Sequence, residues 1–304
     1  MNVIGIDIGG TSIKVGLVQQ GKLITTISQT TVSGKIIAST RAAVDKLLAK
    51  TSLALSDIAG IGITLPGPVY QNTVDYFPNI RFESKDVYGG FQAAFPGMSI
   101  KLLNDANAAA LGELSQLKEP VKDGLMLTVG TGLGGGIIAN SQIIEGAVGL
   151  GGEIGHFPMG SPYQLPCGCG KLDCAETLTS ATGIRNLANV MKKPKETKVK
   201  KTSNVRQIFN YAKAGDAFAI QVVEEWAFYL AKAVHTINVI TNPSVVIIGG
   251  GVANAGEFLL DHVRRAYMTQ AKRDSARKLT FQLATLGNDA GIVGAALSIR
   301  KELK

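Results

Sequence analysis

The sequence predicts an α/β protein built from two lobes, and three observations support this fold class. Apolar strand-like runs alternate with helical patterns in both halves of the chain. In each half, a strand runs into a glycine-rich turn and another strand follows, in GIDIGGTSIK (5–14) and GTGLGGG (130–136). The 304 residues, 45% of them hydrophobic, are ample for two buried cores.

The first half predicts a strand meander followed by an alternation of helices and strands. Glycine turns separate the first strands, and the later short apolar runs are typical of buried strands. In chain order we expect strands at 3–6, 13–18 and 22–27, a helix at 35–50, strands at 58–63 and 100–103, and an alanine-rich helix at 106–117.

The second half begins near Pro120 and repeats the arrangement of strand, glycine turn and strand. The segment 146–182 is rich in Gly and Cys, and we expect it to be mostly irregular. The expected elements are a strand at 125–129, a glycine loop at 130–136, a strand at 137–139, a helix at 218–240, a strand at 244–248, a helix at 257–271, a strand at 279–284 and a helix at 290–303.

Composition and charge argue against membrane and nucleic-acid partners. No run of about 20 apolar residues occurs, and the first residues lack the pattern of a secretory signal, so the cytoplasm is the expected location. The net charge of +8 raises the question of nucleic acid, but the excess is concentrated in KKPKETKVKK (192–201). That stretch contains Pro and has no apolar periodicity. We interpret it as a solvated loop in preference to a binding patch.

The two glycine turns suit phosphate binding. Glycines let backbone N–H groups approach a ligand closely, and the hydroxyls of Thr11 and Thr131 suit phosphate oxygens. Asp7, just before the first turn, suits the magnesium that accompanies phosphate. The alternative is an ordinary tight hairpin, which Gly-Gly alone would explain. The second turn also fits G-x-G-x-x-G, but that dinucleotide fingerprint requires a long helix where a strand follows here.

Two further segments follow buried strands. Gly249-Gly250-Gly251 is either a simple turn into a helix or a place where the backbone approaches a flat group such as adenine or ribose. Asn104 and Asp105 are expected at the carboxyl end of a parallel strand, where α/β enzymes place their sites. Asp105 is either a helix N-cap or a base that accepts the proton of an attacking hydroxyl in phosphotransfer, and one residue can be both.

All three cysteines of the chain lie in one segment, at Cys167, Cys169 and Cys174. An odd, clustered set does not suit a disulfide framework. Together with His156, these residues make a closed tetrahedral Cys₃His zinc site of the structural type, which leaves no position for chemistry. Three reduced thiols that happen to be close are the alternative. We favour zinc because no other cysteine occurs.

Together these segments resemble the ROK family of sugar kinases and repressors, within the hexokinase–actin ATPase superfamily. EIGH followed by the cysteine knuckle is the most specific match. The motifs occur in the family's order from end to end of the chain: DIGGTSIK (7–14), PGPV (66–69), LNDANAAALGE (103–113), GTGLGGG (130–136), EIGH (153–156), CGCGKLDCAE (167–176) and GGGV (249–252).

The resemblance implies a two-lobed ribonuclease H-like (actin-like ATPase) fold with a central cleft and a zinc knuckle. The smaller lobe is expected over 1–118, joined by the last helix at 289–304, and the larger lobe over 119–288 with the zinc-binding loop. The lobes are expected to close on ATP-magnesium and a hexose. Because members of the family are commonly dimers, a homodimer is also expected.

Carried over by position, the resemblance implies roles for individual residues. Asp105 is similar to the general base that activates the sugar hydroxyl. The expected sugar contacts are Asn79, Asn104, Asp105, Glu153, His156 and Glu176. The expected nucleotide contacts are Asp7, Gly9, Gly10, Thr11 and Lys14 in the first phosphate loop, Gly130, Thr131 and Gly132 in the second, and Gly250 and Gly251 at the adenosine. The expected zinc ligands are His156, Cys167, Cys169 and Cys174, with the other ring nitrogen of His156 facing the sugar.

The activity implied is ATP-dependent phosphorylation of a hexose hydroxyl, expected to be the 6-hydroxyl of glucose or a similar hexose, with Mg²⁺ at the reaction and Zn²⁺ in the knuckle. N-acetylmannosamine, N-acetylglucosamine, fructose, allose or a β-glucoside are alternative acceptors. A non-catalytic sugar sensor is disfavoured by Asp105. A repressor is disfavoured because six residues before Asp7 are too few for a DNA-binding unit. Two positions depart from the pattern: Asp173 stands where the family's knuckle usually has Gly, and Phe82 appears where glucokinase-like members often have Trp.

Overall fold

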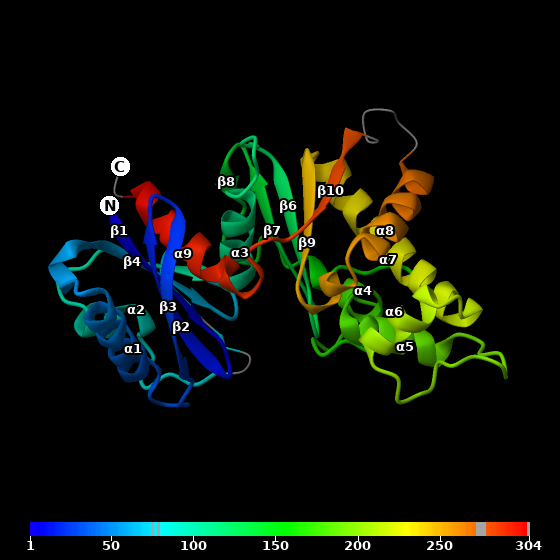
Figure 1. Cartoon of the computed structure of the whole chain (residues 1–304), viewed down its shortest axis with the longest axis horizontal. Coiled ribbons are helices and arrows are strands. Elements are labelled where there is room, and N and C mark those ends of the chain that lie inside the picture. The colour runs from blue at the N-terminus through cyan, green and yellow to red at the C-terminus, as the bar shows by residue number, and fades with distance from the viewer. Residues whose placement is uncertain (75, 78–79, 272–277, 303–304) are drawn as a thin grey trace. The chain divides into compact units, whose positions relative to one another are not determined.

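The chain forms two compact units in this computed structural model, which describes residues 1–302 apart from 75, 78–79 and 272–277 (Figure 1). Unit 1 comprises Met1–Pro120, Ile143–Gly152 and Leu286–Lys304. Unit 2 comprises Val121–Gln142 and Glu153–Thr285. The expected lobes assign 119–288 to the second lobe as a whole, whereas Ile143–Gly152 groups with the first unit.

Unit 1 is a mixed sheet with helices packed on it. Its strands are β1 (Asn2–Ile8), β2 (Ser12–Gln19), β3 (Lys22–Thr30), β4 (Ile58–Leu65) and β5 (Ile100–Asn104). Its helices are α1 (Ile36–Thr51), α2 (Val87–Ala94), α3 (Asp105–Leu114) and α9 (Ala290–Glu302), with the short 3₁₀ turns η1 (Leu55–Asp57) and η5 (Gly287–Asp289).

The strand order of unit 1 is β3-β2-β1-β4-β5. The first three strands form the predicted antiparallel meander, and β1, β4 and β5 run parallel. Because parallel strands end at the same edge, the register places Asp7 beside Thr64 and Leu65 beside Asn104. The polar residues at this edge therefore come from three separate parts of the sequence.

Helix α9 packs directly on the sheet and on α3, as the red helix of Figure 1 shows. Glycines make this close approach possible. A Cβ atom built on Gly5 would lie 2.0 Å from the carbonyl oxygen of Ile292, and one built on Gly294 would lie 1.7 Å from the carbonyl oxygen of Ala108. Any side chain at either position would push α9 away from its neighbours.

Unit 2 has its own mixed sheet and a larger set of helices. Its strands are β6 (Gly124–Val129), β7 (Leu133–Ala139), β8 (Gln142–Ile143, whose second residue already belongs to unit 1), β9 (Val245–Gly249) and β10 (Thr280–Leu283). Its helices are α4 (Ala175–Thr179), α5 (Ala181–Val190), α6 (Val205–Lys213), α7 (Ala217–Thr241) and α8 (Glu257–Gln270), with the 3₁₀ turns η2 (Ile154–His156) and η3 (Gly251–Ala255).

The strand order of unit 2 is β10-β9-β6-β7-β8, with β6, β9 and β10 parallel and β7 antiparallel to β6. One expectation is corrected here: the glycine loop does not extend over 130–136, because β7 already begins at Leu133. Gly135 lies inside β7 for a steric reason. A Cβ atom there would lie 2.2 Å from Cδ1 of Ile154, so the glycine lets η2 pack against the strand.

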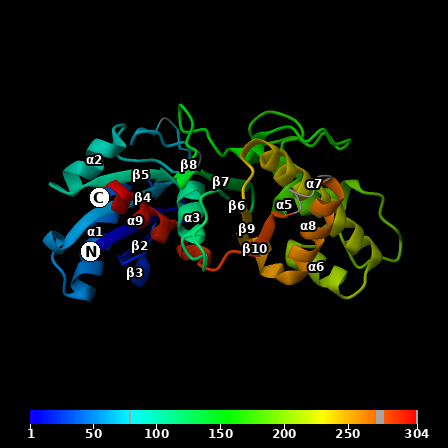
Figure 2. The same ribbon diagram turned by 90° about the horizontal axis from the view of Figure 1, so that it is seen from above.

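Helix α7 lies at the centre of unit 2. It packs against α4, α5, α6 and α8, and Figure 2 shows α7 and α8 side by side. The indole N–H of the buried Trp226 on α7 donates to the carbonyl oxygen of Thr179 at the end of α4 (2.7 Å). None of the helices in the described part of the chain combines the length and hydropathy needed to cross a bilayer.

Candidate active site and metal centre

A carboxylate and a hydroxyl meet at the carboxyl edge of the unit 1 sheet. The hydroxyl of Thr64, at the end of β4, donates to Oδ1 of Asp7, at the end of β1, over 2.7 Å. Burial raises the pKa of Asp7, while the bond from Thr64 and the charge of Lys14 act in the opposite direction. A half-buried carboxylate whose charge is only partly compensated suits a divalent cation, so these residues fit magnesium.

The first glycine turn is held by its own backbone and by a neighbouring strand end. The N–H of Gly9 donates to the carbonyl oxygen of Ser12 (2.9 Å), and the N–H of Thr31 donates to that of Thr11 (3.1 Å). The hydroxyl of Thr31 donates to the carbonyl oxygen of Gly9 (2.7 Å). Thr31 and Thr64 were not predicted from the sequence, because both act through partners more than 15 residues away.

Asn104, not Asp105, caps helix α3. Its Oδ1 accepts from the N–H of Asn107 (3.0 Å), and its Nδ2 donates to the carbonyl oxygen of Gly67 in the PGPV turn (3.0 Å). Asp105 is the first helical residue and is exposed, and its Oδ1 accepts from the N–H of Ala106 (2.8 Å). From the sequence, Asp105 could be the helix N-cap, a catalytic base or both. In the structure the N-cap is its neighbour Asn104.

Asn79, the remaining sugar contact expected in unit 1, lies outside the described residues. Phe82 nearby is buried and packs against Phe77 (ring centroids 4.6 Å apart) and Phe91 (6.2 Å). The residue that replaces the family's frequent Trp is therefore part of the core of unit 1.

The two glycine segments of unit 2 lie at the ends of neighbouring parallel strands. Gly130 follows β6 and Gly250 follows β9, and these strands pair as far as Thr128 and Gly249. The start of α5 supports the first segment. The hydroxyl of Thr182 donates to the carbonyl oxygen of Thr131 (2.8 Å), and the N–H of Ala181 donates to that of Gly130 (2.8 Å).

The EIGH motif and Glu176 lie next to this glycine turn. Glu153 is exposed and precedes η2, and its carbonyl oxygen accepts from the N–H of His156 (3.2 Å). Glu176 lies in the first turn of α4, and a Cβ atom built on Gly132 would lie 2.7 Å from its Oε2. Unit 2 therefore places Glu176 beside the second glycine turn, and Nδ1 of His156 lies 3.9 Å from Oε1 of Glu176.

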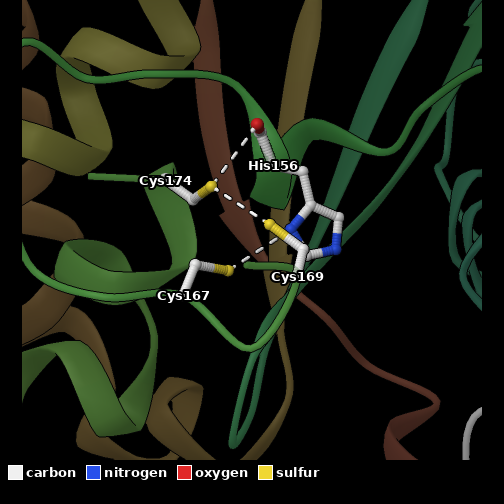
Figure 3. A group of neighbouring side chains, drawn as sticks. All are labelled: His156, Cys167, Cys169 and Cys174. Carbon is white, nitrogen blue, oxygen red and sulfur yellow. Dashed lines mark hydrogen bonds between the residues drawn. The ribbon is translucent and has the colours of Figure 1, made fainter. Parts of the chain in front are cut away.

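The four expected metal ligands form one cluster (Figure 3). Their ligand atoms all lie within 4.8 Å of one another. Sγ of Cys167 lies 3.7 Å from Nδ1 of His156, and Sγ of Cys169 lies 3.6 Å from Sγ of Cys174. A tetrahedral zinc with Zn–S bonds of about 2.3 Å sets its ligand atoms about 3.8 Å apart. The donor set and its spacing both fit zinc.

The thiols differ in how easily they lose their protons. Burial raises the pKa of Cys167 and of Cys174, whereas a hydrogen bond from the backbone of Lys171 lowers the pKa of the exposed Cys169. The Cys167 thiol donates to Oε1 of Glu176 (2.9 Å). Glu176 thus contacts both the metal cluster and the glycine turn.

Comparison with known proteins gives the family. The model of the ROK family matches residues 3–302. A glucokinase from Halalkalibacterium halodurans is 34% identical over 98% of this chain and 95% of its own, and an N-acetylmannosamine kinase from Yersinia pestis is 29% identical over 99% of both.

Solved structures of ROK proteins are also similar to this chain. A ROK hexokinase from Thermus thermophilus has a TM-score of 0.83 at 29% identity and covers 99% of this chain and 100% of its own. A ROK glucokinase from Streptomyces griseus in complex with glucose and AMPPNP has a TM-score of 0.78 at 30% identity with the same coverage. This confirms the two-sheet, actin-like ATPase fold, and the chain belongs to the ROK family.

Proposed function

We propose that this protein transfers the γ-phosphoryl group of ATP to a hexose hydroxyl, expected to be the 6-hydroxyl of glucose or a similar hexose, with Asp105 as general base. One observation carries the proposal. The carboxyl edge of three parallel strands gathers the half-buried carboxylate of Asp7 and the exposed carboxylate of Asp105 in a chain that resembles glucokinases over its whole length.

Phosphoryl transfer needs positioning, a cation and a base more than covalent chemistry. Asp105 is exposed at the start of α3, so an acceptor hydroxyl can reach its carboxylate. General base catalysis of this kind contributes about 10²–10⁴-fold to the rate. Asp105 would take the proton of the hydroxyl as that oxygen attacks phosphorus.

The nucleotide would be held by backbone groups. The turns at Gly9–Thr11 and Gly130–Gly132 offer N–H groups and hydroxyls for phosphate oxygens, and Gly250 and Gly251 would border the adenosine. Asp7, oriented by Thr64, would hold magnesium, which when bound neutralises charge on the phosphates. Lys14 donates to the carbonyl oxygen of Asn288 (3.3 Å) and adds positive charge near Asp7.

Each unit has polar side chains that would suit sugar hydroxyls. Asn104 uses one N–H and one lone pair structurally, which leaves the others for a hydroxyl. Nδ1 of His156 faces the thiols, so Nε2 remains for the sugar. Glu153 and Glu176 would accept from hydroxyls. The zinc would brace this loop and take no part in the reaction, because four protein ligands close its coordination shell.

The choice of acceptor is the open part of the proposal. Glucokinases match the chain over almost its full length, and so do N-acetylmannosamine kinases. One hydroxyl or acetyl contact can separate such substrates. N-acetylmannosamine is therefore the second candidate, and the same experiment decides between them.

The test is ATP-dependent ADP release across glucose, mannose, fructose, allose, N-acetylmannosamine, N-acetylglucosamine and cellobiose. We expect turnover on one of these sugars, with a loss of about 10²–10⁴-fold in Asp105→Asn while sugar binding persists in calorimetry. Asp86→Asn is the matched control, since Asp86 is also an acid at a helix start and Asn caps helices equally well. No turnover on any sugar, with ATP bound, would refute the kinase and favour a sensor.

A further inference from the structure

Asp173 occupies a backbone conformation that normally favours glycine. Its φ is +59°, in the left-handed region, and it immediately precedes the metal ligand Cys174. Its side chain is buried, with 4% of its surface exposed. A buried carboxylate on left-handed backbone is costly unless its surroundings compensate it.

The compensation comes from Ser161. The carboxylate of Asp173 accepts from the backbone N–H of Ser161 (2.6 Å) and from the Ser161 hydroxyl. Ser161 is itself buried, and its Oγ accepts in turn from the N–H of Tyr163 (3.3 Å). Bonds to a charged acceptor are among the stronger hydrogen bonds in proteins. A glycine at position 173 would keep the backbone shape and lose both of them.

The main chain of Asp173 strengthens the same connection. Its N–H donates to the carbonyl oxygen of Leu165 (2.7 Å), and its carbonyl oxygen accepts from the N–H of Met159 (2.9 Å). The segment 159–165 is therefore joined to the end of the knuckle at four points that involve no metal ligand atom.

The segment 159–165 is tied to the central helix α7. Nζ of Lys232 donates to the carbonyl oxygen of Met159 (2.5 Å), and the hydroxyl of Tyr163 donates to Oε1 of Glu225 (3.0 Å). Lys232 and Glu225 both lie on α7. A continuous series of bonds therefore leads from α7 through Ser161 and Asp173 to Cys174.

We propose that Asp173 is a positioning residue that anchors the metal knuckle to α7 through Ser161, and that it does so before any metal binds. The anchor keeps Cys167, Cys169 and Cys174 near their ligand positions in the metal-free protein and slows loss of the metal from the loaded protein. Its carboxylate is committed to Ser161 and is not among the clustered ligand atoms. The proposal concerns metal retention and does not depend on kinase activity.

The test compares wild type with Asp173→Gly in two measurements. In the zinc-loaded protein, transfer of zinc to an excess of a chromogenic chelator is expected to be about tenfold faster in the variant, the scale seen when a contact just outside a metal site is lost. In the metal-free protein, hydrogen exchange is expected to accelerate at the amides of Cys167 and Gly170, which are bonded within the knuckle, and to stay unchanged in α8.

Three further variants keep the result interpretable. Asp173→Asn tolerates left-handed backbone and retains an acceptor, so it should release zinc within about threefold of wild type. Ser161→Ala should release zinc faster than wild type. If Asp173→Gly does not fold, the zinc-release rate of Ser161→Ala tests the proposal in its place. Ser203→Ala removes a buried hydroxyl of the same unit that accepts from the N–H of the nearby Lys200, and it should leave zinc release unchanged.

The proposal is overturned if Asp173→Gly and Ser161→Ala release zinc at the wild-type rate. It is also overturned if exchange rises evenly across unit 2, since that would show a general loss of stability and no local anchor. Neither measurement requires phosphotransfer, so a failure of the proposed kinase activity would leave this test intact.

Discussion

The two units share one strand arrangement and use it differently. The order β3-β2-β1-β4-β5 in unit 1 corresponds to β8-β7-β6-β9-β10 in unit 2. At matching positions, unit 1 has Asp7 and Thr64 where unit 2 has Thr128 and Gly249. Unit 1 therefore presents a carboxylate and a hydroxyl suited to a cation, whereas unit 2 has a hydroxyl and a buried glycine, whose Cβ atom would lie 2.6 Å from Cε of Met126. The same backbone frame thus carries different side chains at its edge in the two units.

The largest effect is expected where unit 1 depends on a glycine. Gly294→Val would place a side chain within 1.7 Å of the Ala108 carbonyl oxygen, so α9 cannot dock on α3. We expect a loss of more than about 3 kcal/mol in the free energy of unfolding, from overpacking and from exposure of the α9 face. Gly251→Ala in unit 2, where a Cβ atom meets nothing within 4 Å, is the control. Equal denaturation midpoints for the two variants would contradict the packing account.

Asp7→Asn tests the chemical difference between the units. We expect kcat to fall about 10²–10³-fold, because the proposed ligand of the magnesium ion is lost. Thr128→Val at the matching position in unit 2 should lower kcat by less than about tenfold. A kcat equally reduced in both variants would mean that the units do not divide the work.

Asp7→Asn should also change how the stability of the protein depends on pH. The raised pKa of Asp7 means that ionisation costs folding free energy at pH values above its ordinary 3.8, and that this cost disappears below that value. Asp7→Asn should therefore unfold at or above the wild-type temperature at pH 7, and the advantage should vanish at about pH 3. A variant less stable than wild type at pH 7 would show that the carboxylate is fully compensated.

Removal of zinc, with magnesium kept in excess, should affect only unit 2. We expect about one zinc per chain from the single cluster of four ligands. Chelation should raise the KM for sugar about tenfold through His156 and Glu176 and leave the KM for ATP nearly unchanged. Elemental analysis and steady-state kinetics before and after chelation measure both. A metal-free protein with unaltered kinetics would rule out the bracing role.

The smallest effect concerns the third residue of each glycine turn. Gly132→Ala should raise the KM for sugar several-fold, since its Cβ atom would lie 2.7 Å from Oε2 of Glu176. The matching position in unit 1 is Thr11, which already carries a side chain. Thr11→Ala should therefore keep the KM for sugar within about twofold of the wild-type value. An unchanged KM in Gly132→Ala would show that Glu176 can move aside without loss.

The features that could be predicted from the sequence are local ones. Apolar periodicity located β1, β4 and β9 and the long helix α7, because each follows a pattern within a few residues. Helix α2 was missed since Gly89 and Gly90 weaken its helical signal. Helix α6 was also missed, although Asn204 and Gln207 form a capping box that could have revealed it.

The side-chain contacts of the site were harder to predict, because they join residues far apart in the sequence. Thr64 lies 57 residues from Asp7, and no local pattern connects them. The cluster of His156, Cys167, Cys169 and Cys174 was predictable because clustered cysteines and a nearby histidine rarely have another use, and the structure brings the four side chains together. The sequence could not show that Asn104 caps the helix while Asp105 stays exposed, because this depends on the exact residue at which α3 begins.

The return of α9 to unit 1 determines the order in which a newly made chain can finish its parts. About 190 residues separate the end of α3 from the end of α9, and ribosomes add about 5–20 residues per second. For about 10–40 s, the face of β1 around Gly5 has no helix to cover it, while every strand and helix of unit 2 is synthesised. The unit that is begun first is completed last. A nascent chain therefore carries an uncovered apolar sheet through most of its synthesis, which is the state that chaperones recognise.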